Sequence, residues 1–428
     1  MSLILATRQK HKGTQSKSAV FWVTLFAIIP TVKPDHRAIA LLIGSSSANY
    51  FDAVFELWTW FSLALILFIF LFTQWKGRYI DSCIICPLLL FLGLTASTFL
   101  SGYKEIDLLL LTFWRIVCPF LLCAICTRAT FSSFCKAWYF FLTITMIFNS
   151  ISMYLYAEHD GMYLSMDITG YGRGYYLYGL DNVCFMYALA GAAVGSFYYR
   201  VKFGHIPLRF FLIYCFIFGA FFYTAAGTAM VIASLLLLFL ICFDLFNKPN
   251  INPTISILIC AAGFVLIVLV QNVDVFSPIL KLIGKDSTFT GRTQIWDAAF
   301  RALSGDELFG FGISPINMHR VLSYVVNNSF IALQIGHLHN IILEFYFKGG
   351  VIGLVFFLLT LLLPFKKAHQ HPCSVIVSML SMYFILMWFT CMFEFRLDTI
   401  TFWLIPILMG HLNLIDKNGR FFLEEVAE

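Results

Sequence analysis

The chain has 428 residues, of which 60% are hydrophobic and only 12% are charged, and its mean hydropathy is +0.84. No soluble fold of this length hides so much apolar surface, so the composition excludes a soluble globular protein and predicts a multi-pass membrane protein. The apolar runs are too long for barrel strands, which favours an all-α fold. We interpret the net charge of +5 through membrane topology and expect no nucleic acid partner.

Twelve apolar segments are predicted to be membrane-spanning helices, each about as long as the roughly 20 residues that a bilayer requires or somewhat shorter. In chain order they are 19–32, 56–73, 82–100, 107–126, 134–155, 183–199, 208–223, 225–246, 254–272, 340–365, 374–393 and 398–416. The first follows a basic head but has no small-residue cleavage site, so we expect a span and not a cleaved signal peptide. Residues 1–428 are thus predicted to form a single membrane domain.

Basic residues predict the orientation of these spans. A cytoplasmic N-terminus places 16 of the 28 basic residues inside: Arg8, Lys10, Lys12, Lys17, Lys76, Arg78, Arg128, Lys136, Arg200, Lys202, Arg209, Lys248, Lys366, Lys367, Lys417 and Arg420. The short outside connections then hold only Lys33, Arg37, Lys104 and Arg173. The positive-inside rule therefore predicts that both termini are cytoplasmic. Two larger extracytoplasmic loops follow, at 156–182 and 273–339.

The twelve cysteines lie almost entirely in or beside apolar segments, and none lies in the loop 273–339. We interpret them as small buried hydrophobic residues and not as disulfides. Cys83 and Cys86 have the CxxC spacing, but no second pair and no histidine cluster accompany them. The sequence therefore predicts no metal and no cofactor.

The loop 273–339 contains a predicted amphipathic helix at 291–303 (GRTQIWDAAFRAL), whose apolar residues recur at helical spacing. Thr290 can cap this helix, which leaves Arg292 in its first turn. The free backbone N–H groups of that turn and the guanidinium make a candidate phosphate site. The alternative is a surface cation that extends toward anionic lipid.

His337-Leu338-His339-Asn340 stands where this loop re-enters an apolar segment, and ionisable groups at a membrane edge are candidates for function. The pKa of an ordinary histidine lies near neutrality, so His339 suits removal of a proton from a hydroxyl. The alternative is an interfacial histidine that caps the following helix. His337 cannot share a helical face with His339 and is expected to be supporting or solvated. A zinc site is not expected, since no third ligand is evident.

Several short motifs occur together in the second half of the chain. Gly291-Arg292-Thr293-x-x-Trp296, then Gly310-x-Gly312, then His339-Asn340 and, after nine intervening residues, Gly350-x-x-Gly353 resemble the O-antigen ligase and Wzy-type polymerase superfamily. The resemblance covers about residues 285–365. The rest of the chain agrees mainly in hydropathy and in having a late, large periplasmic loop.

This resemblance implies a metal-independent membrane glycosyltransferase of the GT-C type in the bacterial plasma membrane. It implies transfer of a glycan from undecaprenyl pyrophosphate, at the outer face, to lipid A–core in ligases or to the next lipid-linked repeat unit in polymerases. The resemblance also implies that His339 is the essential histidine and that Arg292 is the arginine that holds the pyrophosphate. A chain-length regulator is a possible partner.

The chain also departs from the family pattern. Many members have an arginine at the start of a middle span, where this chain reads Thr224-Ala225-Ala226-Gly227-Thr228, so Arg173 or Arg115 is expected to substitute. Leu354 stands where ligases tend to have Ser or Thr. Gly179-Leu180-Asp181-Asn182 at a span entry is more similar to polysaccharide polymerases. These departures favour a polymerase over a ligase. A transporter of lipid-linked sugars is the alternative from another functional class.

Further polar residues complete the set of predicted substrate-binding residues: Arg173, Arg115, Asp181, Asn340, His337, Glu394 and Arg396. Arg173 lies among glycines and tyrosines, which suit a sugar or a plain turn. Arg115 lies mid-span and needs a polar cavity or a partner such as Asp181. Glu394, with Arg396 and Asp398, can bind acceptor hydroxyls, orient His339 or form a solvated rim. A structural ion pair is expected between Glu344 and Lys348, and Gly349, Gly350 and Gly353 are expected to form a helix-packing face.

Overall fold

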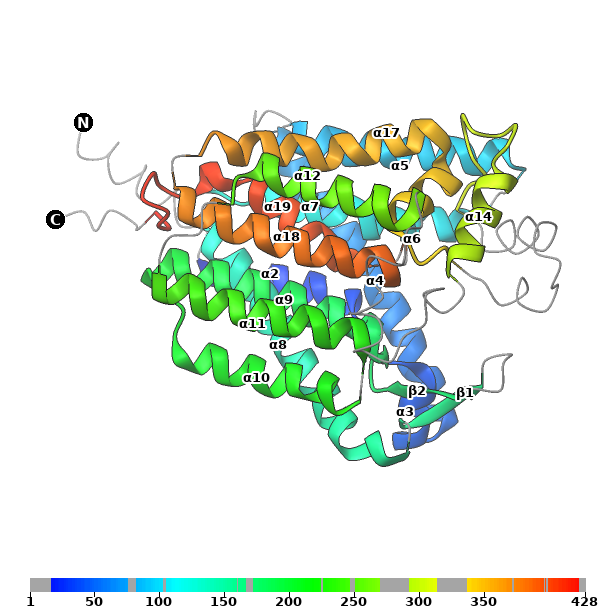
Figure 1. The fold of residues 1–428 in the computed structure, drawn as a ribbon, viewed down its shortest axis with the longest axis horizontal. Helices are drawn as coiled ribbons and strands as arrows, with labels where there is room; N and C mark the ends of the chain where they lie inside the picture. Colours follow the sequence, from blue (N-terminus) through cyan, green and yellow to red (C-terminus); the bar gives the residue numbers. More distant parts are fainter. Residues whose placement is uncertain are drawn as a thin grey trace.

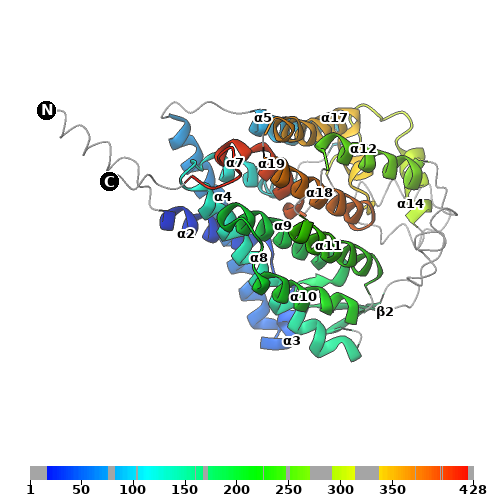
Figure 2. The same ribbon diagram turned by 60° about the vertical axis from the view of Figure 1, so that its left-hand side comes forward.

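The computed structural model is a helical bundle that carries one small sheet (Figure 1). It describes residues 17–75, 82–102, 105–159, 161–166, 172–224, 226–246, 251–269, 292–313, 337–371, 373–395, 397 and 399–422. Figure 2 shows that most of the long helices run side by side along one common direction. This arrangement suits apolar helices that bury their faces against one another and expose the rest to lipid.

The first part of the bundle consists of seven labelled helices. They are α2 (Lys17–Ile28), which a 3₁₀ turn at Ile29–Thr31 extends, α3 (His36–Ile43), α4 (Ser45–Trp75), α5 (Ser82–Leu100), α6 (Ile106–Ile116), α7 (Cys118–Ala124) and α8 (Phe131–Tyr156), which a 3₁₀ turn at Ala157–His159 follows. α6 and α7 meet at a bend of 43°. Pro119 follows this bend, and its missing N–H explains why the helical hydrogen bonds are interrupted there.

The loop between α8 and the next helix contains a three-stranded antiparallel sheet. Its strands are β1 (Tyr163–Met166), β2 (Gly172–Tyr176) and β3 (Gly179–Leu180), in the order β1-β2-β3. The sequence does not predict these strands, because no apolar alternation marks them. Tyr163 pairs with Tyr175 across β1 and β2, and their stacked rings lie 4.8 Å apart, so a cross-strand aromatic pair stabilises the sheet.

The second part of the chain completes the bundle. Its helices are α9 (Asp181–Phe203), α10 (Leu208–Tyr223), α11 (Gly227–Phe246), α12 (Pro253–Phe264), which a π turn at Val265–Leu269 extends, α14 (Arg292–Ala302), α17 (Ile341–His369), α18 (Ser374–Glu394) and α19 (Leu404–Gly410), with 3₁₀ turns at Ile400–Trp403 and Leu412–Leu414. α9 packs against α8, α10, α11, α18 and α19, and most of its side chains are buried. It is therefore the central helix of the bundle.

The described residues include five helices that are long and apolar enough to cross a membrane alone, namely α4, α5, α8, α17 and α18. The bent pair α6–α7 makes a sixth if it is one span. α2, α10, α11, α12 and α19 are shorter apolar helices, and α9 belongs to neither group. The all-α membrane fold is confirmed, whereas the number of twelve spans stays a prediction.

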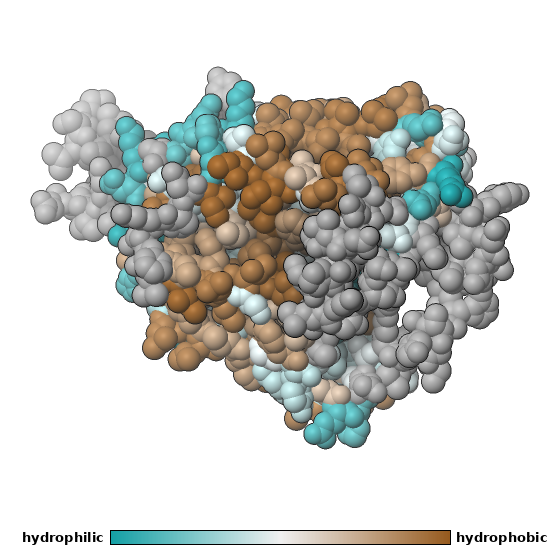
Figure 3. Space-filling model, in the orientation of Figure 1, coloured by the Kyte–Doolittle hydropathy of each residue, from teal (hydrophilic) through white to brown (hydrophobic). Residues whose placement is uncertain are grey.

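The surface of the bundle is apolar over its middle. Figure 3 shows hydrophobic side chains across the centre of one face and hydrophilic residues toward its edges. Large exposed hydrophobic side chains such as Leu212, Leu238 and Leu258 come from α10, α11 and α12. Burial of this surface in lipid is the simplest way to remove it from water.

The two ends of the bundle differ in the segments and contacts that they contain. At one end, Arg420 donates to the carbonyl of Lys202 at 3.5 Å, and the ring of His369 lies 3.2 Å from the Asn252 side chain. The sheet and α14 lie at the other end (Figure 1). The end that contains Arg420 and Lys202 holds many of the basic residues that are predicted to be cytoplasmic. Which end faces the cytoplasm stays a prediction.

α17 is not continuous, because Gly350 has a φ of 61° and a ψ of −160° inside it. A tight turn at Gly310-x-Gly312 occupies the break. The N–H groups of Phe311 and Gly312 donate to the carbonyls of Phe347 and Lys348, at 2.9 and 2.8 Å. The N–H of Val351 donates in return to the backbone carbonyl of Glu307 at 2.7 Å. The turn thus satisfies backbone groups that the break would otherwise leave without a partner.

Ser97 of α5 fixes this turn from the other side. Its hydroxyl lies within hydrogen-bond distance of the carbonyls of Phe309 and Lys348, and it accepts from the N–H of Gly312 at 3.0 Å. α5 packs along α17, with Leu94 against Gly349 and Gly353, as expected for a packing face. Gly350 additionally breaks the helix, which the sequence does not predict. The part of α17 before Gly350 is therefore held in place by α5 and the Gly310-x-Gly312 turn.

Candidate functional site

Three polar side chains converge on Glu394, the last residue of α18. The guanidinium of Arg292 forms an ion pair with Oε1 of Glu394, and the amide of Asn182 donates to the same oxygen at 3.3 Å. Nδ1 of His339 lies 3.7 Å from Oε2. Only 6% of the Glu394 side chain is exposed. One buried carboxylate thus joins α9, α14 and the segment before α17.

α14 places Arg292 at this site. As predicted, residues 292–302 form a helix, in which Trp296 and Ala299 are fully buried. The indole N–H of Trp296 donates to the carbonyl of Leu338 at 3.1 Å. α14 is therefore tied directly to the residue that precedes His339, while the guanidinium of Arg292 stays partly exposed, at 13% of its side chain.

The backbone around His339 is held from several directions. His339 has a φ of 58°, an unusual value for a residue other than glycine, and its carbonyl accepts from the N–H of Phe395 at 3.3 Å. The N–H of Leu338 donates to Oε2 of Glu344 at 2.8 Å, and the other oxygen of Glu344 lies 2.7 Å from Nζ of Lys348. The predicted ion pair is thus confirmed, and it also anchors the histidine segment.

Asn340 caps α17. Its side-chain oxygen accepts from the N–H groups of Ile342 and Leu343 at 3.1 and 3.2 Å, and its amide donates to the carbonyl of Met392 at 3.3 Å. The residue is fully buried. Both ends of its amide are therefore engaged in holding the start of α17 against the end of α18.

His337 lies beside His339, with ring centroids 4.0 Å apart. In a helix the two rings would lie on different faces, but both residues precede the first turn of α17. In this non-helical segment, where His339 has a positive φ, the two rings lie side by side. Among the described residues, no group of three potential ligands could hold a metal ion.

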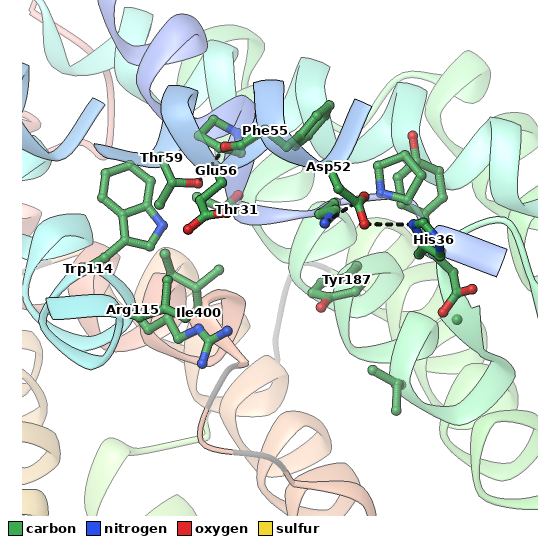
Figure 4. Close-up of a pocket in the computed structure, with 18 of the residues that line it drawn as sticks. Thr31, His36, Asp52, Phe55, Glu56, Thr59, Trp114, Arg115, Tyr187 and Ile400 are labelled. Atoms are coloured by element: carbon green, nitrogen blue, oxygen red, sulfur yellow. Dashed lines mark hydrogen bonds and ion pairs between the residues drawn. The ribbon is translucent and has the colours of Figure 1, made fainter. Parts of the chain in front are cut away.

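Arg115 ends up in a different place from His339. It lies in the last turn of α6 and lines a cavity of about 800 Å³, so the prediction of a polar cavity is confirmed (Figure 4). Asp181, its expected partner, instead begins α9 and accepts from the N–H of Asn182 at 2.6 Å. No carboxylate in the described part of the chain forms an ion pair with Arg115.

For the remaining predicted residues, the structure gives either the backbone position alone or no position. Arg173 lies in β2 opposite Ser165. Gly291, Arg396 and Asp398, like the capping residue Thr290, lie outside the described residues.

Sequence reasoning did not select Asn182, Trp296 or Ser97 as members of the site. Asn182 directly follows Asp181, which was predicted to bind substrate, so the motif Gly179-Leu180-Asp181-Asn182 could have indicated Asn182 as well. Trp296 occurs in the α14 motif, but a buried tryptophan is ordinarily a packing residue. Ser97 sits in an apolar run and carries no local signal at all.

This arrangement presents two cationic or potentially cationic groups on one fixed carboxylate. Arg292 is always charged, whereas His339 can take or give a proton near neutral pH. Glu394 pairs with Arg292 and faces His339, and it does not occupy every donor of the guanidinium, which has five. The remaining donors and the partly exposed imidazole can meet an anionic group and a hydroxyl at the same place.

Comparison with known protein families covers the middle of the chain. Residues 210–358 match the family model that is described as O-antigen ligase. The matched segment contains Arg292, the Gly310-x-Gly312 turn, His339 and Gly350, but it ends before Glu394. No curated protein matches the chain. The match to residues 210–358 confirms the resemblance to the O-antigen ligase and Wzy-type polymerase superfamily, and it implies a function of the glycan ligase or polymerase type.

Proposed function

We propose that this protein polymerises repeat units of a surface polysaccharide at the outer face of the bacterial plasma membrane. It transfers a glycan from undecaprenyl pyrophosphate to a hydroxyl of the acceptor sugar. The observation that carries the proposal is the convergence of Arg292 and His339 on the buried carboxylate of Glu394. An anion-binding cation and a proton acceptor are the two groups that this reaction requires.

The reaction forms a bond between the acceptor oxygen and the anomeric carbon and breaks the bond from that carbon to the pyrophosphate oxygen. The leaving pyrophosphate takes the electron pair of the broken bond. Arg292 stabilises this growing negative charge, because a guanidinium can donate two parallel hydrogen bonds to phosphate oxygens. The first turn of α14 adds backbone N–H groups that have no partner within the helix.

His339 takes the proton of the acceptor hydroxyl. Its imidazole is 21% exposed, so a substrate can reach it, and Nδ1 faces Glu394. A carboxylate at this position orients the ring and favours the protonated form that arises during the transfer. Glu394 is thus a positioning residue that acts through His339 and Arg292.

The O-antigen ligase is the second candidate, because the matching family model bears that description. The same three groups serve either reaction, and only the acceptor differs. A ligase transfers the glycan once, to lipid A–core, whereas a polymerase repeats the transfer on its own product.

Purified protein in detergent, incubated with the lipid-linked repeat unit of the source organism, tests the proposal. We expect a ladder of products for the wild type and none for His339→Ala. His369→Ala is the matched control, since His369 is the last residue of α17, at the opposite end of that helix from His339, and contacts Asn252. It should retain the ladder.

Other outcomes distinguish the alternatives. A single transfer that appears only after addition of lipid A–core would favour the ligase. Lipid binding without transfer to either acceptor would contradict both enzymes and favour a transporter. A ladder that persists in His339→Ala would remove His339 from the mechanism.

A further inference from the structure

A second polar region lies at the same end of the bundle, in the cavity of about 800 Å³ that contains Arg115. Its walls come from the segment before α3, from α4 and α6, and from the β2–β3 turn with the start of α9. The volume is in the range of small-molecule sites, which is about 300–1,000 Å³. The cavity is therefore large enough for a short oligosaccharide.

Carboxylates dominate the charge of this cavity. Five of them line it, against two basic residues and His36: Asp35, Asp52, Glu56, Glu105 and Asp107 against Lys33 and Arg115. Asp52 pairs with Lys33 and His36, each at 2.7 Å. Within the described residues, Glu56, Glu105 and Asp107 form no ion pair. A surplus of carboxylates repels an anion such as pyrophosphate.

Aromatic side chains form much of the remaining wall. Trp60, Trp114, Tyr175, Tyr178 and Tyr187 all line the cavity. Figure 4 shows Glu56 and Arg115 reaching into the space from opposite sides, with Trp114 and Tyr187 around it. Flat rings offer apolar faces to the C–H surfaces of sugars, and carboxylates accept strong hydrogen bonds from hydroxyl groups.

The first turn of α9 lies between this cavity and Glu394. Leu180 and Val183 line the cavity, whereas Asn182 donates to Glu394. Ile400, five residues after Phe395, also lines the cavity. A glycan held there would thus have one end beside the groups that are proposed to react.

We propose that the cavity binds the sugar part of a lipid-linked substrate, and that it selects glycans made of neutral or amino sugars. This inference rests on the proposed function, because it assigns the glycan and the pyrophosphate of that reaction to separate sites. Arg115 binds glycan oxygens among the carboxylates, while Arg292 binds the pyrophosphate. Glu56 and Asp107 accept hydrogen bonds from sugar hydroxyl or ammonium groups.

The test compares two ligands on the full-length protein in nanodiscs. One is undecaprenyl pyrophosphate without sugar, and the other is the glycan-bearing lipid extracted from the source organism. We expect Glu56→Gln and Asp107→Asn to weaken binding of the glycan-bearing lipid by about tenfold each and to leave binding of the bare lipid unchanged. Both side chains are exposed and both replacements keep the shape, so folding should be preserved. Glu158→Gln, outside the cavity, is the matched control.

Arg292→Ala separates this inference from the proposed function, because it should weaken binding of both lipids. If the wild type binds neither lipid, the proposed function and the inference fail together. If Glu56→Gln and Asp107→Asn leave the glycan-bearing lipid unaffected, or weaken the bare lipid as well, the inference alone is overturned. Sugar analysis of the lipid that the wild type retains should show neutral or amino sugars; mainly uronic acids would overturn the selectivity.

Discussion

The Glu394 site and the Arg115 cavity lie at the same end of the bundle but have opposite charge balances. At Glu394 a single buried carboxylate holds Arg292 and faces His339. Around Arg115, five carboxylates outnumber two basic side chains. The first arrangement favours an approaching anion and the second disfavours it. Charge alone therefore distinguishes the proposed site of the leaving group from the proposed site of the sugar chain.

The two regions also differ in how they are held. The segment around His339 is fixed by hydrogen bonds that its carbonyls accept from Trp296 and Phe395 and by one that the Leu338 N–H donates to Glu344. The cavity is lined by α4, α6 and the start of α9 together with loop segments, and its carboxylates Glu56 and Asp107 are exposed. A reacting group needs a fixed position, whereas a site for a varied glycan gains from polar groups at its surface.

The largest expected effect is on the stability of the fixed region. Glu344→Leu removes the partner of Lys348, which is buried, and the acceptor of the Leu338 N–H. We expect a loss of about 3–5 kcal/mol in the free energy of unfolding, because a buried charge is left unpaired. Thermal unfolding in detergent measures the loss.

The double variant Glu344→Leu/Lys348→Met is the control for this prediction. It removes both charges, so stability should recover in part, but transfer activity should not, since Leu338 still lacks its acceptor. Full recovery of activity would show that the anchor does not position His339.

The next effect concerns the leaving group. Arg292→Ala should lower the rate of transfer by about 10²–10³-fold, because the charge on the pyrophosphate loses its stabilising cation. Arg292→Lys should retain more activity, since it keeps the charge but not the paired donors. The ladder assay under single-turnover conditions measures both. Equal rates for Arg292→Ala and the wild type would leave the anion site unassigned.

A third prediction tests the turn that fills the break in α17. Gly310→Ala places a Cβ 2.5 Å from the carbonyl oxygen of Phe347, at a φ of 68°. Gly305 also has a positive φ, of 101°, but has open space around it. We expect Gly305→Ala to cost about 1 kcal/mol and Gly310→Ala about 2–3 kcal/mol more, from overpacking. Equal melting temperatures for the two variants would contradict the contact.

Sequence alone predicted much of this fold because apolar length is a strong signal for membrane helices. α14 was also predictable, since Ile295, Trp296 and Ala299 recur at helical spacing. The sheet was not, because its strands are short and its stability comes from the Tyr163–Tyr175 pair. The break in α17 depends on a loop that is distant in sequence, and no local pattern shows such a contact.

The candidate site was likewise predicted only in part from the sequence. Arg292 and His339 were predicted from motifs that lie close together in the chain. Glu394 was a candidate with three alternative roles, and only the three-dimensional arrangement places it between Arg292 and His339. The proximity of His337 to His339 was missed because helix geometry was applied to residues that precede the helix.

The most direct test of the account is the transfer rate of Glu394→Gln at saturating lipid substrate. This replacement keeps the size of the side chain and a hydrogen bond to Arg292, but it removes the charge that faces His339. We predict a loss of at least about tenfold in kcat, with binding of bare undecaprenyl pyrophosphate equal to or tighter than that of the wild type. A kcat within twofold of the wild type would contradict the claim that Glu394 organises the reacting groups.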